Sequence, residues 1–180
     1  IYLALWVGKQ LKINKMKHII YLLCICFFLS SCNNNKTVDI EKATQEANAF
    51  IENQLDFFAK NNLELAKATF ADDGILIGTD AAEYFEGWSE MEPSMKAQLA
   101  TIKNAQFTSR NLKVVMSDDG NMASYTQLTD FAFVVDGEPG EIKDARLSGV
   151  IEKINGVWKI IQIHFSIGLN GQAVEYETSK

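Results

Sequence analysis

The chain has 180 residues, of which 47% are hydrophobic and 22% are charged, and its formal net charge is −6. This length suits one domain with a substantial core, and the hydrophobic fraction excludes a disordered chain. The acidic balance argues against nucleic acid as a partner, because phosphate binding needs clustered Lys and Arg. Residues 32–180 contain all 23 acidic residues but only 13 of the 17 basic ones. This part of the chain is therefore strongly acidic.

A short basic stretch, Met16-Lys17-His18, precedes an unbroken apolar run over residues 19–29. The run is shorter than the ~20 residues of a membrane-spanning helix, and it is typical of the apolar region of a secretory signal peptide. It ends in Leu29-Ser30-Ser31-Cys32, which resembles the bacterial lipobox. The resemblance implies that Cys32 is lipidated and becomes the first residue of the mature protein. The alternative is a buried cysteine after an ordinary signal peptide.

The chain therefore divides into five expected segments. They are an over-extended start (1–15) with Met16 as the true first residue, a lipoprotein signal peptide (16–31), a tether (32–38), a folded domain (39–170) and a loose tail (171–180). The expected location is the cell envelope, outside the cytoplasm. Asn33 stands where an Asp often holds lipoproteins at the inner membrane, which favours the outer membrane and the periplasm.

The first part of the folded domain has the pattern of amphipathic helices. Apolar residues recur at three- and four-residue spacing over 40–58, which predicts one helix. Asn61-Asn62 interrupts this pattern and can cap a second, shorter helix over 63–70. Asp72-Asp73-Gly74 predicts a turn, and a third helix is expected over about 89–103.

The second part has the pattern of strands joined by turns. The expected strands are 105–116, 122–135, 141–154 and 157–167, and Asn155-Gly156 is a strong hairpin signal between the last two. Helices followed by a long antiparallel meander predict an α+β fold, with the N-terminal helices packed on one face of an antiparallel sheet.

The last hairpin can be followed residue by residue. A two-residue turn at 155–156 predicts that Gly149 pairs with Gln162, although a single β-bulge would swap part of this assignment. The residues that this register puts on one face are Trp158, Ile160, Gln162, His164 and Ser166. Both faces are largely apolar near the middle. We therefore expect a homodimer through the outer face of the sheet.

Two stretches resemble motifs of one known family, the SnoaL-like domains. Residues 77–88 (IGTDAAEYFEGW) resemble its "iGTd..E...G" segment, and residues 149–160 with His164 and Ser166 resemble its closing "v..k..g.WkI...H.S" hairpin. This family belongs to the nuclear transport factor 2-like superfamily, also called the cystatin-like α+β cone. The resemblance covers about 40–170 and implies a curved sheet wrapped around helices, with a cone-shaped pocket. The superfamily includes ketosteroid isomerase, scytalone dehydratase, polyketide cyclases and many non-enzymatic binding domains, so no single reaction is implied.

His164 is the candidate general base, since it is the only histidine after Cys32 and its charge can change near neutral pH. If its face lines the cone, Gln162 and Ser166 can orient a bound molecule, and Trp158 lies beside it. Gly149 would leave room opposite Gln162. The alternative is a core histidine with a structural hydrogen bond.

Two acidic positions and two aromatic ones complete the candidates. Asp130 interrupts an apolar strand, and inside an apolar cone its pKa would be raised so that it could transfer protons. On the outer face it would be an ordinary surface charge. Asp80 and Glu83 have the spacing of a capping box at a helix start. Tyr84 and Trp88 can form the pocket rim or cover the core.

No metal or cofactor is expected, since one histidine without a further cysteine cannot build a typical transition-metal site and no glycine-rich phosphate loop is present. We predict a lipid-anchored domain that binds a small, largely apolar molecule and lacks catalysis. One alternative is an isomerase, dehydratase or cyclase that uses His164 as its base. The other is a dimeric interaction module whose pocket is filled by its own aromatic side chains.

Overall fold

The computed structural model describes residues 38–168. The predicted over-extended start, the signal peptide, Cys32 and the tail at 171–180 lie outside the described residues, as does the tether up to residue 37. Within the described range, no helix combines the length and the apolar character that crossing a membrane requires.

Four helices occupy the described range. They are α2 (Ile40–Asn53), α3 (Asp56–Ala59), α4 (Leu63–Thr69) and α5 (Trp88–Thr101). Asp39 caps α2 by accepting a hydrogen bond from the backbone N–H of Lys42, and Asn62 caps α4 through the N–H of Leu65, as its position predicts. The single helix expected over 40–58 is wrong, because the chain leaves helical geometry around Gln54 and restarts at Asp56.

Six strands form one sheet. They are β1 (Phe70–Ile77), β2 (Tyr84–Glu86), β3 (Lys103–Met116), β4 (Met122–Val135), β5 (Glu138–Ile154) and β6 (Val157–Ser166), in the order β2-β1-β6-β5-β4-β3. The expected meander of β3 to β6 is confirmed. Two details of the prediction are wrong: Asp72-Asp73-Gly74 lies inside β1 and is not a turn, and β1 pairs parallel with β6, so that the sheet is mixed.

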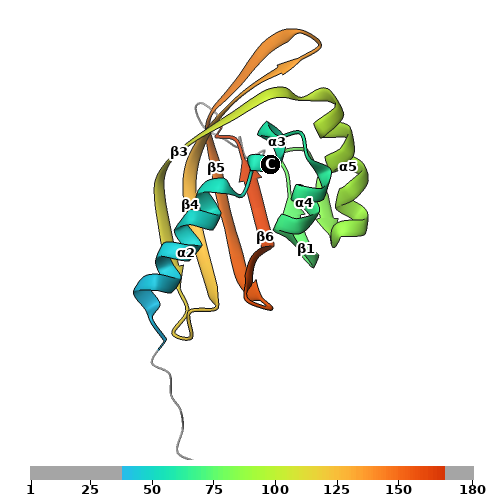
Figure 1. The fold of residues 1–180 in the computed structure, drawn as a ribbon. Coiled ribbons are helices and arrows are strands. Elements are labelled where there is room, and N and C mark those ends of the chain that lie inside the picture. The colour runs from blue at the N-terminus through green and yellow to red at the C-terminus, as the bar shows by residue number, and fades with distance from the viewer. Residues whose placement is uncertain (1–37, 169–180) are drawn as a thin grey trace, which may run out of the picture. The chain divides into compact units, whose positions relative to one another are not determined.

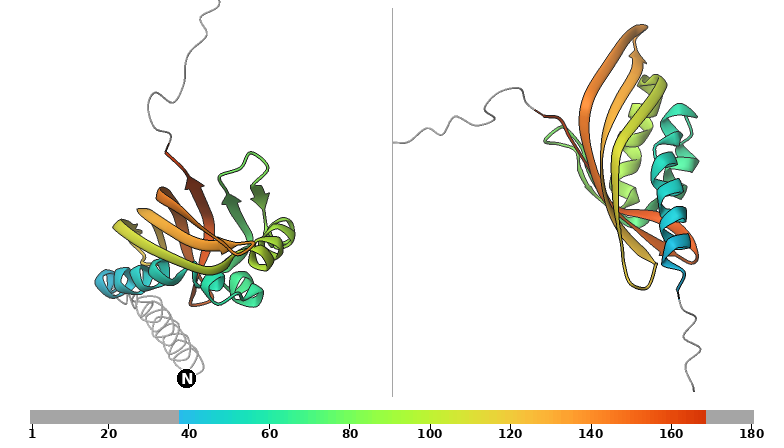
Figure 2. Two further views of the ribbon diagram at one scale, coloured as in Figure 1. Left: turned by 90° about the horizontal axis from the view of Figure 1, so that it is seen from above. Right: turned by 90° about the vertical axis from the view of Figure 1, so that its left-hand side faces the viewer.

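The helices cover one face of the curved sheet, which we call the inner face (Figure 1). Figure 2 shows the helices on one side of the strands, with the long β4–β5 hairpin curving past them. Buried side chains of α2 and α5, including Ile51 and Met91, meet buried residues of β5 and β6 such as Leu147 and Ile160 in a single core. We call the opposite side of the sheet the outer face. The α+β architecture is thus the predicted one.

The β5–β6 hairpin contains the feature that decides which residues face the helices. Its turn at Asn155-Gly156 has positive φ at both residues, and Ile154 pairs with Val157 as predicted. Further along, Ile151 pairs with Ile160 but Val150 pairs with Gln162, so that Ile161 is an extra residue on β6. This β-bulge reverses the alternation of side chains beyond it. The predicted pairing of Gly149 with Gln162 is therefore wrong, and Gly149 pairs with Ile163.

Candidate functional site

A cavity of about 140 Å³ lies between helices α3 and α5 and the inner face of the sheet. Its walls are mainly aromatic and aliphatic. The phenylalanines that line it are Phe57, Phe58, Phe70, Phe107, Phe131 and Phe165. Leu55, Leu76, Met95, Ile142 and Ala145 add aliphatic surface. The cavity is therefore predominantly apolar, with a few polar groups among its lining residues.

The phenylalanines form a connected aromatic wall. Phe107 on β3 and Phe131 on β4 are cross-strand partners, and their rings stack with centroids 4.4 Å apart and an interplanar angle of 4°. Phe58 of α3 approaches both rings at 5.9 and 6.2 Å, and its neighbour Phe57 lies 4.7 Å from it. Such centroid distances are those of favourable aromatic pairs. One side of the cavity is therefore lined by a cluster of aromatic rings in mutual contact.

The loop between β1 and β2 forms a polar rim of the cavity through Gly78, Thr79 and Glu83. The Glu83 carboxylate accepts hydrogen bonds from the backbone N–H groups of Thr79 and Asp80, at 3.0 and 3.2 Å. Its other oxygen accepts from the Gln98 amide at 3.2 Å. The capping-box interpretation of Asp80 and Glu83 is wrong, because no helix begins there. The two residues close a tight loop with the same kind of hydrogen bond.

Gly78 makes this loop possible. A Cβ on Gly78 would overlap the Glu83 carboxylate and come within 2.7 Å of its Cδ. The Gly78 N–H also donates to the backbone carbonyl of Glu83 at 2.7 Å. The Gly-Thr-Asp-x-x-Glu pattern is thus explained by the loop at the cavity rim.

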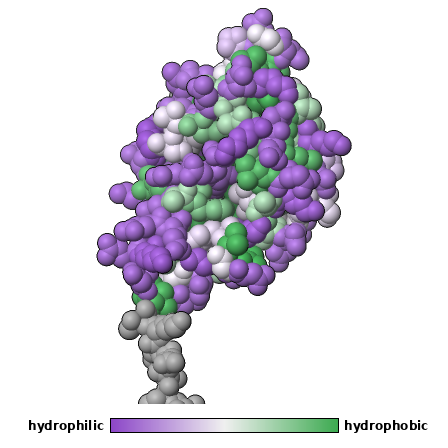
Figure 3. Space-filling view, viewed as in Figure 1, coloured by the Kyte–Doolittle hydropathy of each residue, from purple (hydrophilic) through white to green (hydrophobic). Residues whose placement is uncertain are grey.

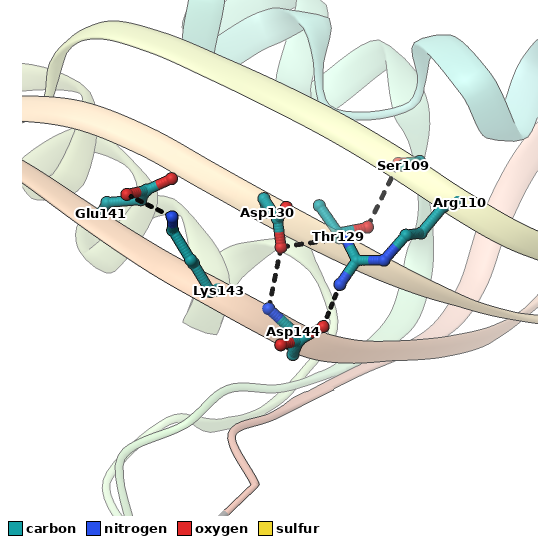
Figure 4. Close-up of polar contacts among 7 residues, drawn as sticks. All are labelled: Ser109, Arg110, Thr129, Asp130, Glu141, Lys143 and Asp144. Atoms are coloured by element: carbon teal, nitrogen blue, oxygen red, sulfur yellow. Dashed lines mark hydrogen bonds and ion pairs between the residues drawn. The ribbon is translucent and has the colours of Figure 1, made fainter.

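Thr129 supplies a buried hydroxyl on the cavity wall. Its side chain is 1% exposed and lines the cavity from β4. Its Oγ1 lies 3.1 Å from the Oγ of the exposed Ser109 on β3, where either hydroxyl can donate (Figure 4). Neither Thr129 nor any of the six phenylalanines was among the pocket residues predicted from the sequence. Their alternation with polar residues along β3 and β4 was a usable signal for one shared face.

None of the side chains predicted to form the pocket lines this cavity. Trp88 and Trp158 are buried in the core, where Trp88 packs near Phe70 and Trp158 lies beneath the Lys153 ammonium. Tyr84 is 54% exposed on β2, at the edge of the sheet. Its hydroxyl donates to Glu86.

Gln162, His164 and Ser166 share the outer face, because the bulge at Ile161 turns their neighbours Ile163 and Phe165 inward. His164 pairs with Ser148 on β5 and with Ile77 on β1. The expected common face of Trp158 and His164 is therefore wrong. His164 does not reach a molecule held in the cavity.

Gly149 leaves no free space either. A Cβ there would come within 2.7 Å of the Tyr125 hydroxyl. The room that the missing side chain was expected to provide is filled by the Tyr125 ring, which is buried against the inner face.

Asp130 also lies on the outer face, since its neighbours Thr129 and Phe131 both line the cavity. Figure 4 shows it among charged side chains of β3 and β5. It accepts a hydrogen bond from the backbone N–H of Asp144 at 2.8 Å and pairs with Arg110 at 3.0 Å. The pKa of Asp130 is held below its ordinary value, first by the hydrogen bond from the Asp144 N–H and next by the contact with Arg110. Of the two positions considered for Asp130, the outer face is therefore the observed one, and the proton-transfer role inside the cone, with its raised pKa, does not apply.

Arg110 bridges two carboxylates, since it also pairs with Asp144. The pKa of Arg110 is raised above its ordinary value, first by its hydrogen bond to Asp130. Asp144 has a positive φ and lies where β5 bulges opposite Asp130. Across residues 38–168, no group of three or more His, Cys, Asp and Glu side chains is arranged to hold a metal ion.

A curved sheet that encloses an apolar cavity with helices on its inner face defines the nuclear transport factor 2-like class of α+β domains. A family model described as a SnoaL-like domain matches residues 47–170. The chain therefore belongs to the SnoaL-like domain family. A search of curated proteins found no match.

Solved structures show the same fold. A nuclear transport factor 2-like superfamily protein of Salmonella enterica is 21% identical, with a TM-score of 0.65 over 76% of this chain and 99% of that one. A protein of Pseudomonas putida, described as nuclear transport factor 2-like and of unknown function, is 18% identical, with a TM-score of 0.60 over 78% and 98%. A structure from Novosphingobium aromaticivorans, provisionally assigned as a scytalone dehydratase, is 12% identical, with a TM-score of 0.62 over 70% and 84%. At these identities the likeness shows the fold alone.

Proposed function

We propose that this domain binds a small, largely apolar molecule in the cavity between α3, α5 and the sheet. The observation that carries the proposal is the cavity itself, about 140 Å³ in volume and lined by six phenylalanines. An engineered apolar cavity of about 150 Å³ in another protein is large enough to bind benzene. The ligand expected here is a molecule with a single ring or a short branched chain.

Binding without catalysis is the better-supported role. Of the cavity-lining residues in the described range, Glu83 alone is ionisable. Its carboxylate already accepts three hydrogen bonds that hold the loop and Gln98. The Glu83 carboxylate thus has a structural role at the cavity rim, and an isomerase or dehydratase based on His164 would need a different site, because His164 lies on the outer face. The alternative of a pocket filled by its own aromatics is disfavoured by the space that remains.

The test is to identify what the cavity holds. The full chain is purified from its cells under native conditions, and its small molecules are extracted and identified by mass spectrometry. Ala145→Leu fills the cavity from β5, while Ala97→Leu adds the same atoms to an exposed position of α5. We expect one apolar compound with the wild type and Ala97→Leu, and little with Ala145→Leu. Equal amounts in a folded Ala145→Leu variant would place the ligand elsewhere.

We also propose that the domain is attached to a membrane through lipid on Cys32. The support is the lipobox-like sequence before Cys32 and the short polar stretch of five residues that follows it. Val38 and Ile40 are 47% and 37% exposed at the start of α2, and Figure 3 shows apolar surface there. Mass spectrometry of the N-terminal peptide of the cell-made protein is expected to find a diacylated Cys32. An unmodified peptide that continues upstream through Ser31 would exclude the anchor.

A further inference from the structure

Thr129 is the buried polar side chain among the residues that line the cavity, at 1% exposed. Of the other polar lining residues, Thr79 is exposed, and the Gln98 amide donates to Glu83 and Ser94. The hydrogen-bond partner of Thr129 in the described part of the chain is the Ser109 hydroxyl, 3.1 Å away. Ser109 is exposed, and its own remaining hydrogen-bonding capacity is met by solvent.

A hydroxyl group carries one donor and two acceptor lone pairs. The contact between Thr129 and Ser109 uses one hydrogen and one lone pair between them. If Ser109 donates, the Thr129 hydrogen is free for a ligand. If Thr129 donates, its lone pairs are free to accept. In both arrangements the Thr129 hydroxyl has hydrogen-bonding capacity left, and a ligand hydroxyl can satisfy either one.

The surroundings of Thr129 specify the rest of the ligand. Thr129 is two residues from Phe131 on the same face of β4, and Ser109 is two residues from Phe107 on β3. The stacked rings of Phe107 and Phe131 therefore lie next to the Thr129 hydroxyl. A planar ring that packs against this aromatic wall can direct a substituent at Thr129. Aromatic pairs contribute more than their buried area alone.

The lining also sets the charge of the ligand. No Lys, Arg or His is among the lining residues of the described cavity, and the one ionisable lining residue, Glu83, is acidic. An anionic ligand would lose its hydration without gaining a counter-charge, which is costly in an apolar cavity. Fatty acids and aromatic carboxylates are therefore disfavoured relative to neutral molecules.

Building on the proposed binding function, we infer that the ligand is a neutral, single-ring aromatic compound with one hydroxyl group, and that Thr129 is the residue that selects it. The ring packs against Phe107 and Phe131, and the hydroxyl forms a hydrogen bond with Thr129. The exposed charges around Asp130 take no part, since they lie on the outer face.

The test compares two probes of nearly equal size, phenol and toluene, by calorimetric titration of the full chain. Thr129→Val removes the hydroxyl and keeps the shape, Thr129→Ser keeps the hydroxyl, and Ser109→Ala removes only the exposed partner. In Thr129→Val the preference for phenol over toluene should fall by roughly three- to tenfold, because one net hydrogen bond is lost. Thr129→Ser and Ser109→Ala should keep the preference of the wild type.

The outcomes separate this inference from the function on which it rests. If toluene binds and the preference is the same in Thr129→Val, the cavity is a binding site but Thr129 does not select the ligand. Benzoate that binds as tightly as phenol would overturn the inferred charge of the ligand. If neither probe binds the wild type and extraction also yields no apolar compound, the proposed function itself is wrong. Near-UV circular dichroism verifies that each variant is folded. If Thr129→Val is not folded, Thr129→Ala, which also removes the hydroxyl, takes its place and should show the same loss of preference.

Discussion

Tyr125 and Gln54 form a hydrogen bond inside the core that joins α2 to β4. The Tyr125 hydroxyl donates to the Gln54 Oε1 at 2.5 Å, and each residue is 2% exposed. Tyr125→Phe would leave this oxygen buried without a donor. We expect the free energy of unfolding to fall by about 1–3 kcal/mol. Urea titration measures the loss.

The matched control for Tyr125→Phe is Tyr84→Phe, which removes a hydroxyl from an exposed side chain that donates to Glu86 at 3.3 Å. Its effect should stay within about 0.5 kcal/mol. Equal effects of the two substitutions would show that the buried hydrogen bond adds nothing to stability.

The contacts of Asp130 predict how stability depends on acid. Its pKa is held below the ordinary value by the Asp144 N–H and by Arg110, whereas in the unfolded chain it returns to about 3.9. A lowered folded-state pKa gives stability that is present above the unfolded pKa and is lost as the pH falls through the folded one. Asp130→Asn should therefore destabilise the domain at pH 6–7, and the difference from the wild type should shrink below about pH 4.

Thermal unfolding between pH 2 and pH 7 measures this difference. Glu92→Gln, which removes an exposed carboxylate from α5, controls for the loss of one negative charge. A destabilisation by Asp130→Asn that is constant from pH 7 to pH 2 would contradict the role assigned to its ionised form.

At the scale of elements, the loop between β1 and β2 depends on one glycine. In Gly78→Ala the added Cβ occupies the position of the Glu83 carboxylate, so that the hydrogen bonds to the Thr79 and Asp80 N–H groups are lost. We expect hydrogen exchange at these two amides to speed up roughly tenfold or more, since hydrogen bonds to charged groups contribute about 1.5–3 kcal/mol. Thr79→Ala alters the same loop without displacing Glu83 and should leave exchange near that of the wild type.

If exchange at these amides is the same in Gly78→Ala as in the wild type, the Glu83 carboxylate does not hold the loop. Measuring exchange across β5 as well separates a local effect from a general loss of stability, because the core strands exchange only when larger parts of the domain open.

Local patterns predicted most elements, because a helix cap or a two-residue turn is specified by neighbouring residues. Asn62 and Asn155-Gly156 are such cases, and both predictions are confirmed. For Gln162, His164 and Ser166, the predicted site is wrong because of one residue, Ile161. Nothing in its local sequence reveals that it is an extra residue on β6, because the bulge depends on how β5 and β1 fit on either side of it. One extra residue moved His164 from the predicted pocket to the outer face.

At the scale of the whole molecule, the outer face of the sheet remains to be explained. It carries the apolar side chains of Ile75, Ile77 and Val150 beside Gln162 and His164. The solvent-facing side of an antiparallel sheet is ordinarily polar. We therefore predict that two copies of the chain pack through this face.

Val150→Lys tests the dimer at the middle of the outer face. Val150 lies between Ser124 and Gln162, so that a lysine there would be buried without a counter-charge in the interface while remaining solvated in a monomer. The variant should keep its fold and dissociate at concentrations at least roughly tenfold higher than the wild type does. Ala49→Lys, at an exposed position of α2, should dimerise as the wild type does. Sedimentation equilibrium of the wild type and the two variants measures the dimerisation. The outer face is not the interface if the wild type is monomeric at tens of micromolar. The same conclusion follows if Val150→Lys dimerises as the wild type does.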